Sequence, residues 1–293
     1  MRMLRTLVSP RGFDGIAVGG GGVRTIAYAG ALGQLGDARL HTIKHVTGTS
    51  GGCAAAIMLA ARMPAHALAD SWRHISFERL AQAKEYAHAH LLVDAMHIVK
   101  SYGVLDPQLL DAVYEQAMGA AGISIDTTFA EMRQLYNTNL QFVATDLNRG
   151  RPFVFSADTT PDEHIVFGAR ASSAIPGFFF PVTAPDGTLL VDGGVSGDTH
   201  VGACKAGGAT RVLRLSLRST DDDTPRKVNS LVDYLEAIEM AQLRSIWDAP
   251  PLPAASVTIW TNDVRATDFE ISEQQKELLV EQGVKAARRA FPS

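Results

Sequence analysis

The first part of the chain contains short apolar runs that end in glycine. Each run is followed by a segment whose apolar residues recur at helical spacing. Residues 13–19 (FDGIAVG) are typical of a buried strand, and Val23 to Leu35 then places small and apolar residues at helical spacing. Residues 41–47 (HTIKHVT) and Cys53 to Arg62 repeat this order, and Pro64 is the expected helix stop. The pattern predicts two consecutive units of strand, glycine turn and helix.

Helical and strand patterns continue to alternate along the rest of the chain. Residues 66–100 predict two or three helices, and residues 219–226 (STDDDTPR) predict an exposed loop. Further helices are expected at 109–118, 129–136 and 271–290, and strands at 140–145, 153–155, 189–192, 211–217 and 256–261. This alternation predicts an α/β sheet with helices on both faces. We expect a single domain over residues 1–293, with a core at about 13–217 and the helices and strand of 227–293 packed on it.

Composition and charge narrow the class of protein. The 293 residues are 46% hydrophobic and 20% charged, which suits a chain that buries a large core. The net charge of −4 provides no basic surface for nucleic acid, so we expect no nucleic-acid partner. Cys53 and Cys204 lack metal-ligand spacing and are expected to be small core residues.

The sequence predicts neither a secretory signal nor a membrane anchor. Residues 1–11 contain no apolar stretch of the length that a secretory signal needs. The run from Cys53 to Ala61 is shorter than the roughly 20 residues of a membrane-spanning helix. We expect no transmembrane segment, and a location that is cytoplasmic, or secreted without a cleaved signal.

A serine stands at the centre of the second glycine turn. Gly48, Ser50 and Gly52 form a G-x-S-x-G pentapeptide between a predicted strand and a predicted helix, which is the context of a nucleophile elbow. Glycine neighbours would let strand and helix pack closely while Ser50 Oγ projects at the helix N-terminus. The alternative is a glycine-rich turn with an incidental serine.

The first glycine turn is a candidate anion site. Gly19 to Arg24 follows a strand and opens a helix, so its backbone N–H groups can converge on negative charge. Thr25 stands where a dinucleotide-binding motif needs its third glycine, and no Walker lysine follows, so an oxyanion hole is favoured over phosphate binding. Arg24 either braces this loop, attracts a phosphate head group or is a surface arginine.

A nucleophilic serine needs a base that accepts its proton. Histidine is the usual partner of a nucleophilic serine, but neither His164 nor His200 lies in a context typical of a catalytic base. Asp192 ends a predicted strand and precedes Gly193 and Gly194, which permits close approach to the Ser50 turn. Asp198 is the other candidate base, in a less favourable context.

With these motifs, the sequence resembles the patatin-like phospholipases over nearly the whole chain. The three candidate segments occur in the family's order, and two further segments before the aspartate, residues 144–148 (ATDLN) and 171–182 (ASSAIPGFFFPV), are similar to family signatures. The matching motifs are Gly20-Gly21-Gly22-Val23-Arg24 for the oxyanion hole, Gly48-Thr49-Ser50-Gly51-Gly52 for the nucleophile elbow and Asp192-Gly193-Gly194 for the aspartate motif.

The resemblance implies a three-layer α/β/α fold with a mainly parallel sheet and a catalytic dyad of Ser50 and Asp192. It implies hydrolysis of carboxylic esters in phospholipids or other acyl lipids at a membrane surface, and in some members dependence on a protein activator. Neutral-lipid hydrolysis, acyl transfer and a lipid-binding or partner-binding module with a vestigial site are the alternatives. The sequence departs from the family pattern at Thr25, where glycine is usual, and at residues 195–200, where asparagines and a proline are common.

Three other features complete the expectations. Phe178, Phe179 and Phe180 are expected to be core rather than a lipid entrance, and residues 91–99 form either a lid or an amphipathic helix packed on the sheet. The histidines between residues 66 and 97 lack zinc-ligand spacing, and no acidic loop has calcium-ligand spacing. We expect neither a metal nor another cofactor.

Overall fold

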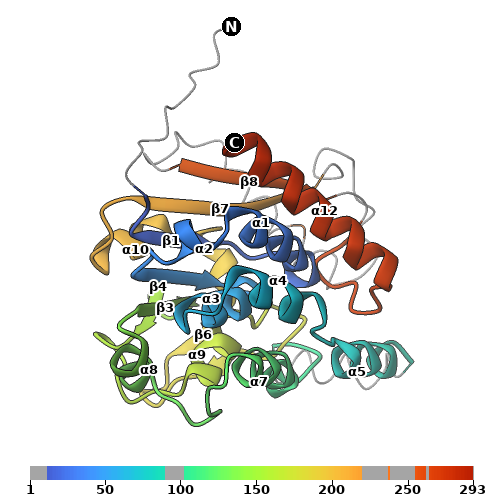
Figure 1. The fold of residues 1–293 in the computed structure, drawn as a ribbon. Helices are drawn as coiled ribbons and strands as arrows, with labels where there is room; N and C mark the ends of the chain where they lie inside the picture. The colour runs from blue at the N-terminus through green and yellow to red at the C-terminus, as the bar shows by residue number, and fades with distance from the viewer. Residues whose placement is uncertain (1–11, 90–101, 220–236, 238–254, 262–263, 293) are drawn as a thin grey trace, which may run out of the picture.

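The computed structural model describes residues 12–89, 102–219, 237, 255–261 and 264–292 (Figure 1). A mostly parallel sheet runs through its centre in the order β5-β6-β3-β2-β1-β7-β8, with β4 paired to β3 beside this path. The pairs formed by β1, β2, β3, β7 and β8 are parallel, whereas β4, β5 and β6 join antiparallel. The strands are β1 (Gly15–Val18), β2 (His45–Thr49), β3 (Asn139–Asp146), β4 (Arg151–Ser156), β5 (Val182–Thr183), β6 (Leu189–Val191), β7 (Val212–Ser219) and β8 (Ala255–Thr261).

Both faces of the sheet are covered, and the central strand β1 shows this residue by residue. Side chains alternate between the two faces of a strand. Ile16 and Val18 belong to the large core beneath the helices of one face, whereas Ala17 packs with Val201 and Cys204 on the other. The predicted sheet with helices on both faces is therefore confirmed, as is the buried position of both cysteines.

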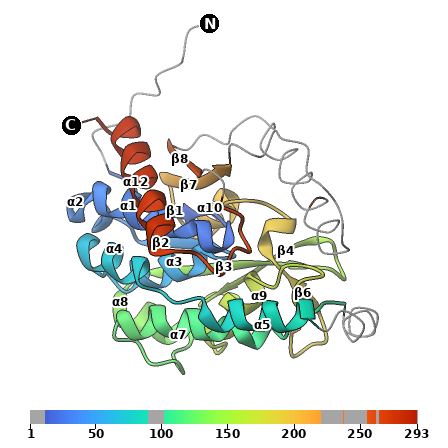
Figure 2. The same cartoon turned by 90° about the vertical axis from the view of Figure 1, so that its right-hand side faces the viewer.

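Helices of the larger face stack around α1, which packs against both α4 and α12, and Figures 1 and 2 show α10 on the opposite face. The larger face holds α1 (Ala27–Leu35), α3 (Gly52–Ala60), α4 (Ala65–Arg73), α7 (Asp111–Ala120), α9 (Ile165–Ser172) and α12 (Glu273–Ala290). The other helical segments are η1 (Gly22–Ile26), α2 (Asp37–Leu40), α5 (Glu78–Ala89), η2 (Pro107–Leu110), α8 (Phe129–Tyr136), η3 (Gly193–Val195) and α10 (Val201–Ala206).

The structure corrects some predicted boundaries. The helix expected from Val23 begins as the 3-10 helix η1 and becomes α-helical at Ala27. The strand expected at 41–47 is β2 at 45–49, so it continues through Gly48 and Thr49 of the pentapeptide. Helices α9 and α10 were not predicted.

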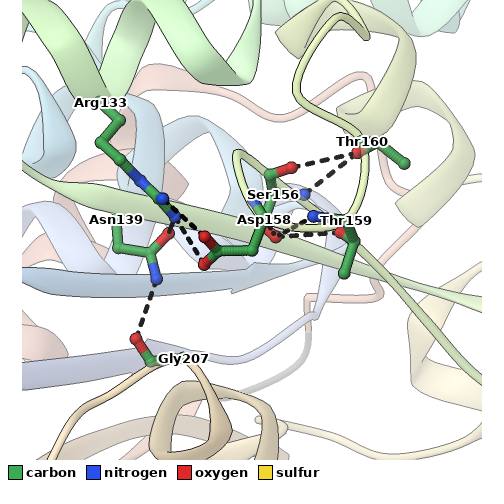
Figure 3. A network of polar contacts seen from close by, with 7 residues as sticks. All are labelled: Arg133, Asn139, Ser156, Asp158, Thr159, Thr160 and Gly207. Carbon is green, nitrogen blue, oxygen red and sulfur yellow. Dashed lines mark hydrogen bonds and ion pairs between the residues drawn. The ribbon is translucent and has the colours of Figure 1, made fainter.

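Polar side chains join the sheet to its surroundings at the start of β3 (Figure 3). Arg133 of α8 donates to both carboxylate oxygens of Asp158, at 2.6 Å each, and to the side-chain oxygen of Asn139 at 2.8 Å. Asn139 in turn donates to the carbonyl of Gly207, which follows α10, at 3.0 Å. This network ties elements of both faces together where β3 begins.

Several expectations concern residues 90–101 and 220–254. The alternatives for residues 91–99 and most of the loop at 219–226 lie outside the described residues. Phe178 and Phe179 are buried, which confirms their assignment to the core, and Phe180 is partly exposed. Within the described ranges, every helix falls short of the length or apolar character needed to cross a membrane.

Candidate active site

The sheet register brings the three candidate segments together. Gly19 and Ser50 follow the neighbouring parallel strands β1 and β2, so both lie at the same edge of the sheet. Thr49 pairs with Val143 of β3, and β6 runs antiparallel beside β3 with Val191 opposite Thr145. The chain leaving β6 therefore turns back toward Thr49. A Cβ placed on Gly193 would lie 2.0 Å from the Val143 carbonyl oxygen and 3.0 Å from the Thr49 side chain.

Ser50 sits on the turn between β2 and α3 in a strained backbone conformation. Its φ of 52° lies in the left-handed region, which costs a non-glycine residue about 1 to 3 kcal/mol. The residue is 6% exposed, and α3 begins two residues later at Gly52. This geometry directs the positive end of a fully buried helix at the serine.

Glycines allow the elbow and the first glycine loop to touch. A Cβ on Gly48 would lie 2.9 Å from the Cys53 Cα, and one on Gly52 would lie 2.5 Å from the Gly19 carbonyl oxygen. A Cβ on Gly20 would lie 3.0 Å from the Ser50 Cβ. The expected close packing of strand and helix is present, and Gly20 is in direct contact with the serine.

Backbone donors of the glycine loop divide into two groups. Val23 N–H donates to the Ala266 carbonyl at 3.0 Å, and Arg24 N–H donates to the Gly21 carbonyl at 3.2 Å. The N–H groups of Gly20, Gly21 and Gly22 have no hydrogen-bond acceptor within the described ranges. Val23 and Arg24 therefore already use their backbone donors, whereas the three glycines keep theirs for an anion.

Side chains donate hydrogen bonds to the carbonyl groups of the same loop. The Tyr28 hydroxyl donates to Gly19 O at 3.1 Å, Arg24 Nε to Gly21 O at 3.3 Å and the Thr25 hydroxyl to Gly22 O at 2.6 Å. Because the C=O and N–H of one peptide plane point in opposite directions, a fixed Gly19 carbonyl also fixes the Gly20 N–H. Thr25, the departure from the family pattern, braces the loop, and so does Arg24.

Asp192 follows β6 and is 1% exposed. Its Oδ1 accepts the Gly194 N–H at 2.7 Å, whereas Oδ2 is buried without a standard hydrogen bond among the described residues. Burial raises the pKa of the carboxyl to about 6, although the Ser50 hydroxyl and the Gly194 N–H act in the opposite direction. The Ser50 hydroxyl is therefore close to the carboxylate but not in standard hydrogen-bond geometry, a common arrangement in sites without substrate.

The other candidate bases are engaged elsewhere. His200 Nε2 donates to the Gly193 carbonyl at 3.0 Å, and burial lowers the pKa of this ring. His164 precedes the first residue of α9, the helix whose last residue is Ser172, and its ring contacts the Asp126 carbonyl at 2.9 Å. Asp198 forms an ion pair with Arg214 at 3.0 Å.

Two contacts at the elbow could not be predicted from the sequence pattern. Ser50 N–H donates to the Ser172 hydroxyl at 3.0 Å, and that hydroxyl donates to the Val143 carbonyl at 2.6 Å. The Gly51 N–H has no hydrogen-bond acceptor in the described part of the chain and stands at the N-terminus of α3. Ser172 lies in the segment 171–176, which matches a family signature, but the pattern assigned it no role.

Chemically, the arrangement joins a buried hydroxyl and a buried carboxylate of raised pKa to free N–H donors of partly exposed glycines. Such a set can transfer a proton from the serine and stabilise an oxyanion. Within the described ranges, no cluster of three or more His, Cys, Asp or Glu side chains is arranged to hold a metal ion.

Comparisons with known proteins agree on one family. Residues 16–203 match the family model of the patatin-like phospholipases. The chain is 25% identical over 284 residues to the uncharacterized protein YqhO of Bacillus subtilis (strain 168), covering 92% of this chain and 94% of that protein. It is 24% identical over 293 residues to the uncharacterized protein R571 of Acanthamoeba polyphaga mimivirus, covering 96% and 95% respectively.

Solved structures share the fold. VipD from Legionella pneumophila is similar with a TM-score of 0.59 and 18% identity, covering 96% of this chain and 67% of VipD. The type III effector ExoU of Pseudomonas aeruginosa is similar with a TM-score of 0.50 and 21% identity, and the chain spans only 53% of its length. The fold is therefore patatin-like, as the sequence resemblance implied. Because the family model covers well over half of its length, the chain belongs to the patatin-like phospholipase family.

Proposed function

We propose that this protein is a lipid acyl hydrolase of the phospholipase A or lysophospholipase type, with Ser50 as nucleophile and Asp192 as base. The observation that carries the proposal is the pairing of a strained serine with a buried carboxylate. Burial raises the pKa of Asp192 to about 6, which makes this carboxylate a stronger base than an exposed aspartate.

The reaction follows from these groups. Asp192 accepts the Ser50 proton while Ser50 Oγ attacks the ester carbonyl carbon, and the carbonyl oxygen becomes an oxyanion. Collapse breaks the bond to the alcohol oxygen, which takes the proton from Asp192, and an acyl-enzyme remains. Water then gives a proton to Asp192 and attacks the acyl carbon. Collapse of this second intermediate breaks the bond to Ser50 Oγ, which takes the proton back from Asp192, and the fatty acid is released.

The free donors of Gly20, Gly21 and Gly22 support an oxyanion hole. One such preorganised donor typically contributes about 3 to 4 kcal/mol to transition-state stabilisation. Gly20 supports this role best, because it contacts Ser50 and its peptide plane is held by Tyr28. We propose these three residues, without Val23 and Arg24, as the donor set.

Family membership supports an acyl-lipid substrate presented at a membrane surface, which the enzyme would contact peripherally. One sheet contains both β1 and β8, and this supports a single domain for the whole chain. Neutral-lipid hydrolysis and acyl transfer are the activities that product analysis would separate from phospholipid hydrolysis.

Product analysis on mixed phospholipid vesicles tests the proposal. Mass spectrometry should detect free fatty acid and lysophospholipid with the wild-type protein, and neither product with Ser50→Ala. Transfer of acyl groups to an added alcohol would indicate acyl transfer instead. A wild-type protein that is folded but yields no more product than Ser50→Ala would refute the hydrolase assignment.

A further inference from the structure

We propose that Ser172 is a positioning residue that holds the Ser50 backbone in the conformation needed for attack. The inference deepens the proposed function and rests on it. Ser172 is the last residue of α9 and is fully buried. Its hydroxyl accepts the Ser50 N–H at 3.0 Å and donates to Val143 O at 2.6 Å.

The hydrogen bond from Ser50 to Ser172 helps to keep the Ser50 backbone in its strained conformation. Ser50 has a φ of 52°, a conformation that a non-glycine residue leaves unless its surroundings hold it. Ser172 Oγ is the partner of the Ser50 N–H, and β3, whose Val143 carbonyl accepts the Ser172 proton, is a central strand. The hydroxyl therefore links the turn to the rigid sheet.

The same segment also holds the proposed base. The Asp192 N–H donates to the Ala174 carbonyl at 2.9 Å, two residues after Ser172. On the other side, the Thr145 hydroxyl of β3 donates to the Asp192 carbonyl at 2.9 Å. Ser172 and Ala174 thus contact the backbones of the two members of the proposed dyad and set their relative position.

Helix α9 is itself anchored close to Ser172. Arg170 donates to both carboxylate oxygens of Asp111 on α7, at 2.7 and 2.6 Å, and both side chains are about four-fifths buried. Ion pairs with this bidentate geometry restrict both partners. The end of α9 is therefore a fixed support for the elbow.

The Ser172 hydroxyl has no proton-transfer role in this arrangement. Its single proton is donated to the Val143 carbonyl, and its lone pair accepts the Ser50 N–H. Removing the hydroxyl should therefore lower the rate of attack without changing the pH at which Asp192 ionises.

Three variants test the inference: Ser172→Ala removes the hydroxyl, Ser172→Cys replaces it with a weaker hydrogen-bonding group, and Ser173→Ala is the matched control. Ser173 is the buried neighbour whose hydroxyl bonds to Tyr114 instead of Ser50. Hydrolysis of a soluble ester gives kcat, KM and the pH profile, and thermal unfolding checks the fold of each variant.

We expect kcat of Ser172→Ala to fall by about 10- to 100-fold, because small misplacements of reacting groups have effects of this size. KM and the midpoint of the pH profile should not change, Ser172→Cys should also lose rate, and Ser173→Ala should stay within about threefold of the wild type. If Ser172→Ala does not fold, Ser172→Cys decides.

Folded Ser172 variants with wild-type kcat would overturn the inference. So would equal losses in Ser172→Ala and Ser173→Ala, or failure of both Ser172 variants to fold, because each indicates a structural role. A wild-type protein without esterase activity would instead refute the proposed function, and the inference with it.

Discussion

Replacing Asp192 by asparagine should stabilise the protein above neutral pH while it abolishes the proposed hydrolysis. The carboxylate is buried, and its Oδ2 has no standard hydrogen bond within the described ranges. Burial raises the pKa of this group from 3.8 to about 6. A raised pKa means that the folded protein favours the protonated acid, so ionisation at high pH weakens the fold.

The pKa gives the size of the effect. One pKa unit corresponds to about 1.4 kcal/mol of unfolding free energy. The rise from 3.8 to about 6 therefore means that ionisation of Asp192 lowers the unfolding free energy by roughly 3 kcal/mol. The contribution of the protonated carboxyl to stability is fully present below about pH 4 and is lost as the pH rises through about 6. Asparagine keeps an oxygen for the Gly194 N–H but adds an amide group beside Ser50, so we expect a net gain of about 1 to 3 kcal/mol at about pH 8.

Denaturant unfolding of wild type and Asp192→Asn at about pH 8 and about pH 4.5 measures this gain. The difference in unfolding free energy should be largest at the higher pH and shrink toward zero at the lower. Asp192→Glu serves as a control that keeps the charge and should gain nothing at high pH. A difference for Asp192→Asn that is independent of pH, or of opposite sign, would refute a buried carboxylate of raised pKa.

Other perturbations probe the surrounding structure. Tyr28→Phe frees the Gly19 carbonyl and should lower kcat by about tenfold with little change in KM, in steady-state kinetics; unchanged kcat would refute the bracing of Gly20. Burial raises the pKa of Asp14, but the hydrogen bonds that Thr210 and Arg211 donate to it together outweigh burial and leave the pKa lowered. Asp14→Ala should therefore destabilise the protein by about 1 to 2 kcal/mol near neutral pH. That loss should shrink as the pH falls below the lowered pKa, because the protonated carboxyl forms weaker hydrogen bonds, and unfolding curves at both pH values would show whether it does. His200→Asn should keep activity within about threefold, whereas a folded but inactive variant would contradict the dyad.

Much of the fold could be predicted because its central strands and helices have simple local patterns. Residues 15–18 and 52–60 are almost entirely apolar. Glycines stand at both ends of the first segment and at the start of the second, so both elements were predicted nearly at their true ends. Helix α9 was missed because it is short and contains Gly168, which lies against Phe129 and interrupts the helical pattern. Its packing partners lie far away in sequence.

The candidate site likewise has residues that local motifs predict and contacts that they do not. Ser50 and Asp192 stand in local glycine motifs that the sequence displays. Other contacts join residues more than a hundred positions apart. Val23 N–H donates to the Ala266 carbonyl, and Ser50 N–H donates to the Ser172 hydroxyl. No local pattern encodes such contacts, so the sequence could not show which N–H groups of the glycine loop are already engaged, and it gave Ser172 no role.

The central claim is that Ser50 is a nucleophile activated by Asp192, and labelling with a fluorophosphonate probe tests it most directly. Peptide mass spectrometry should place the label on Ser50, at a rate that rises with pH through a midpoint near 6. Ser50→Ala should not be labelled, and Asp192→Asn should react at least about a hundredfold more slowly. Absence of label from folded wild-type protein, or equal labelling of Asp192→Asn, would contradict the account.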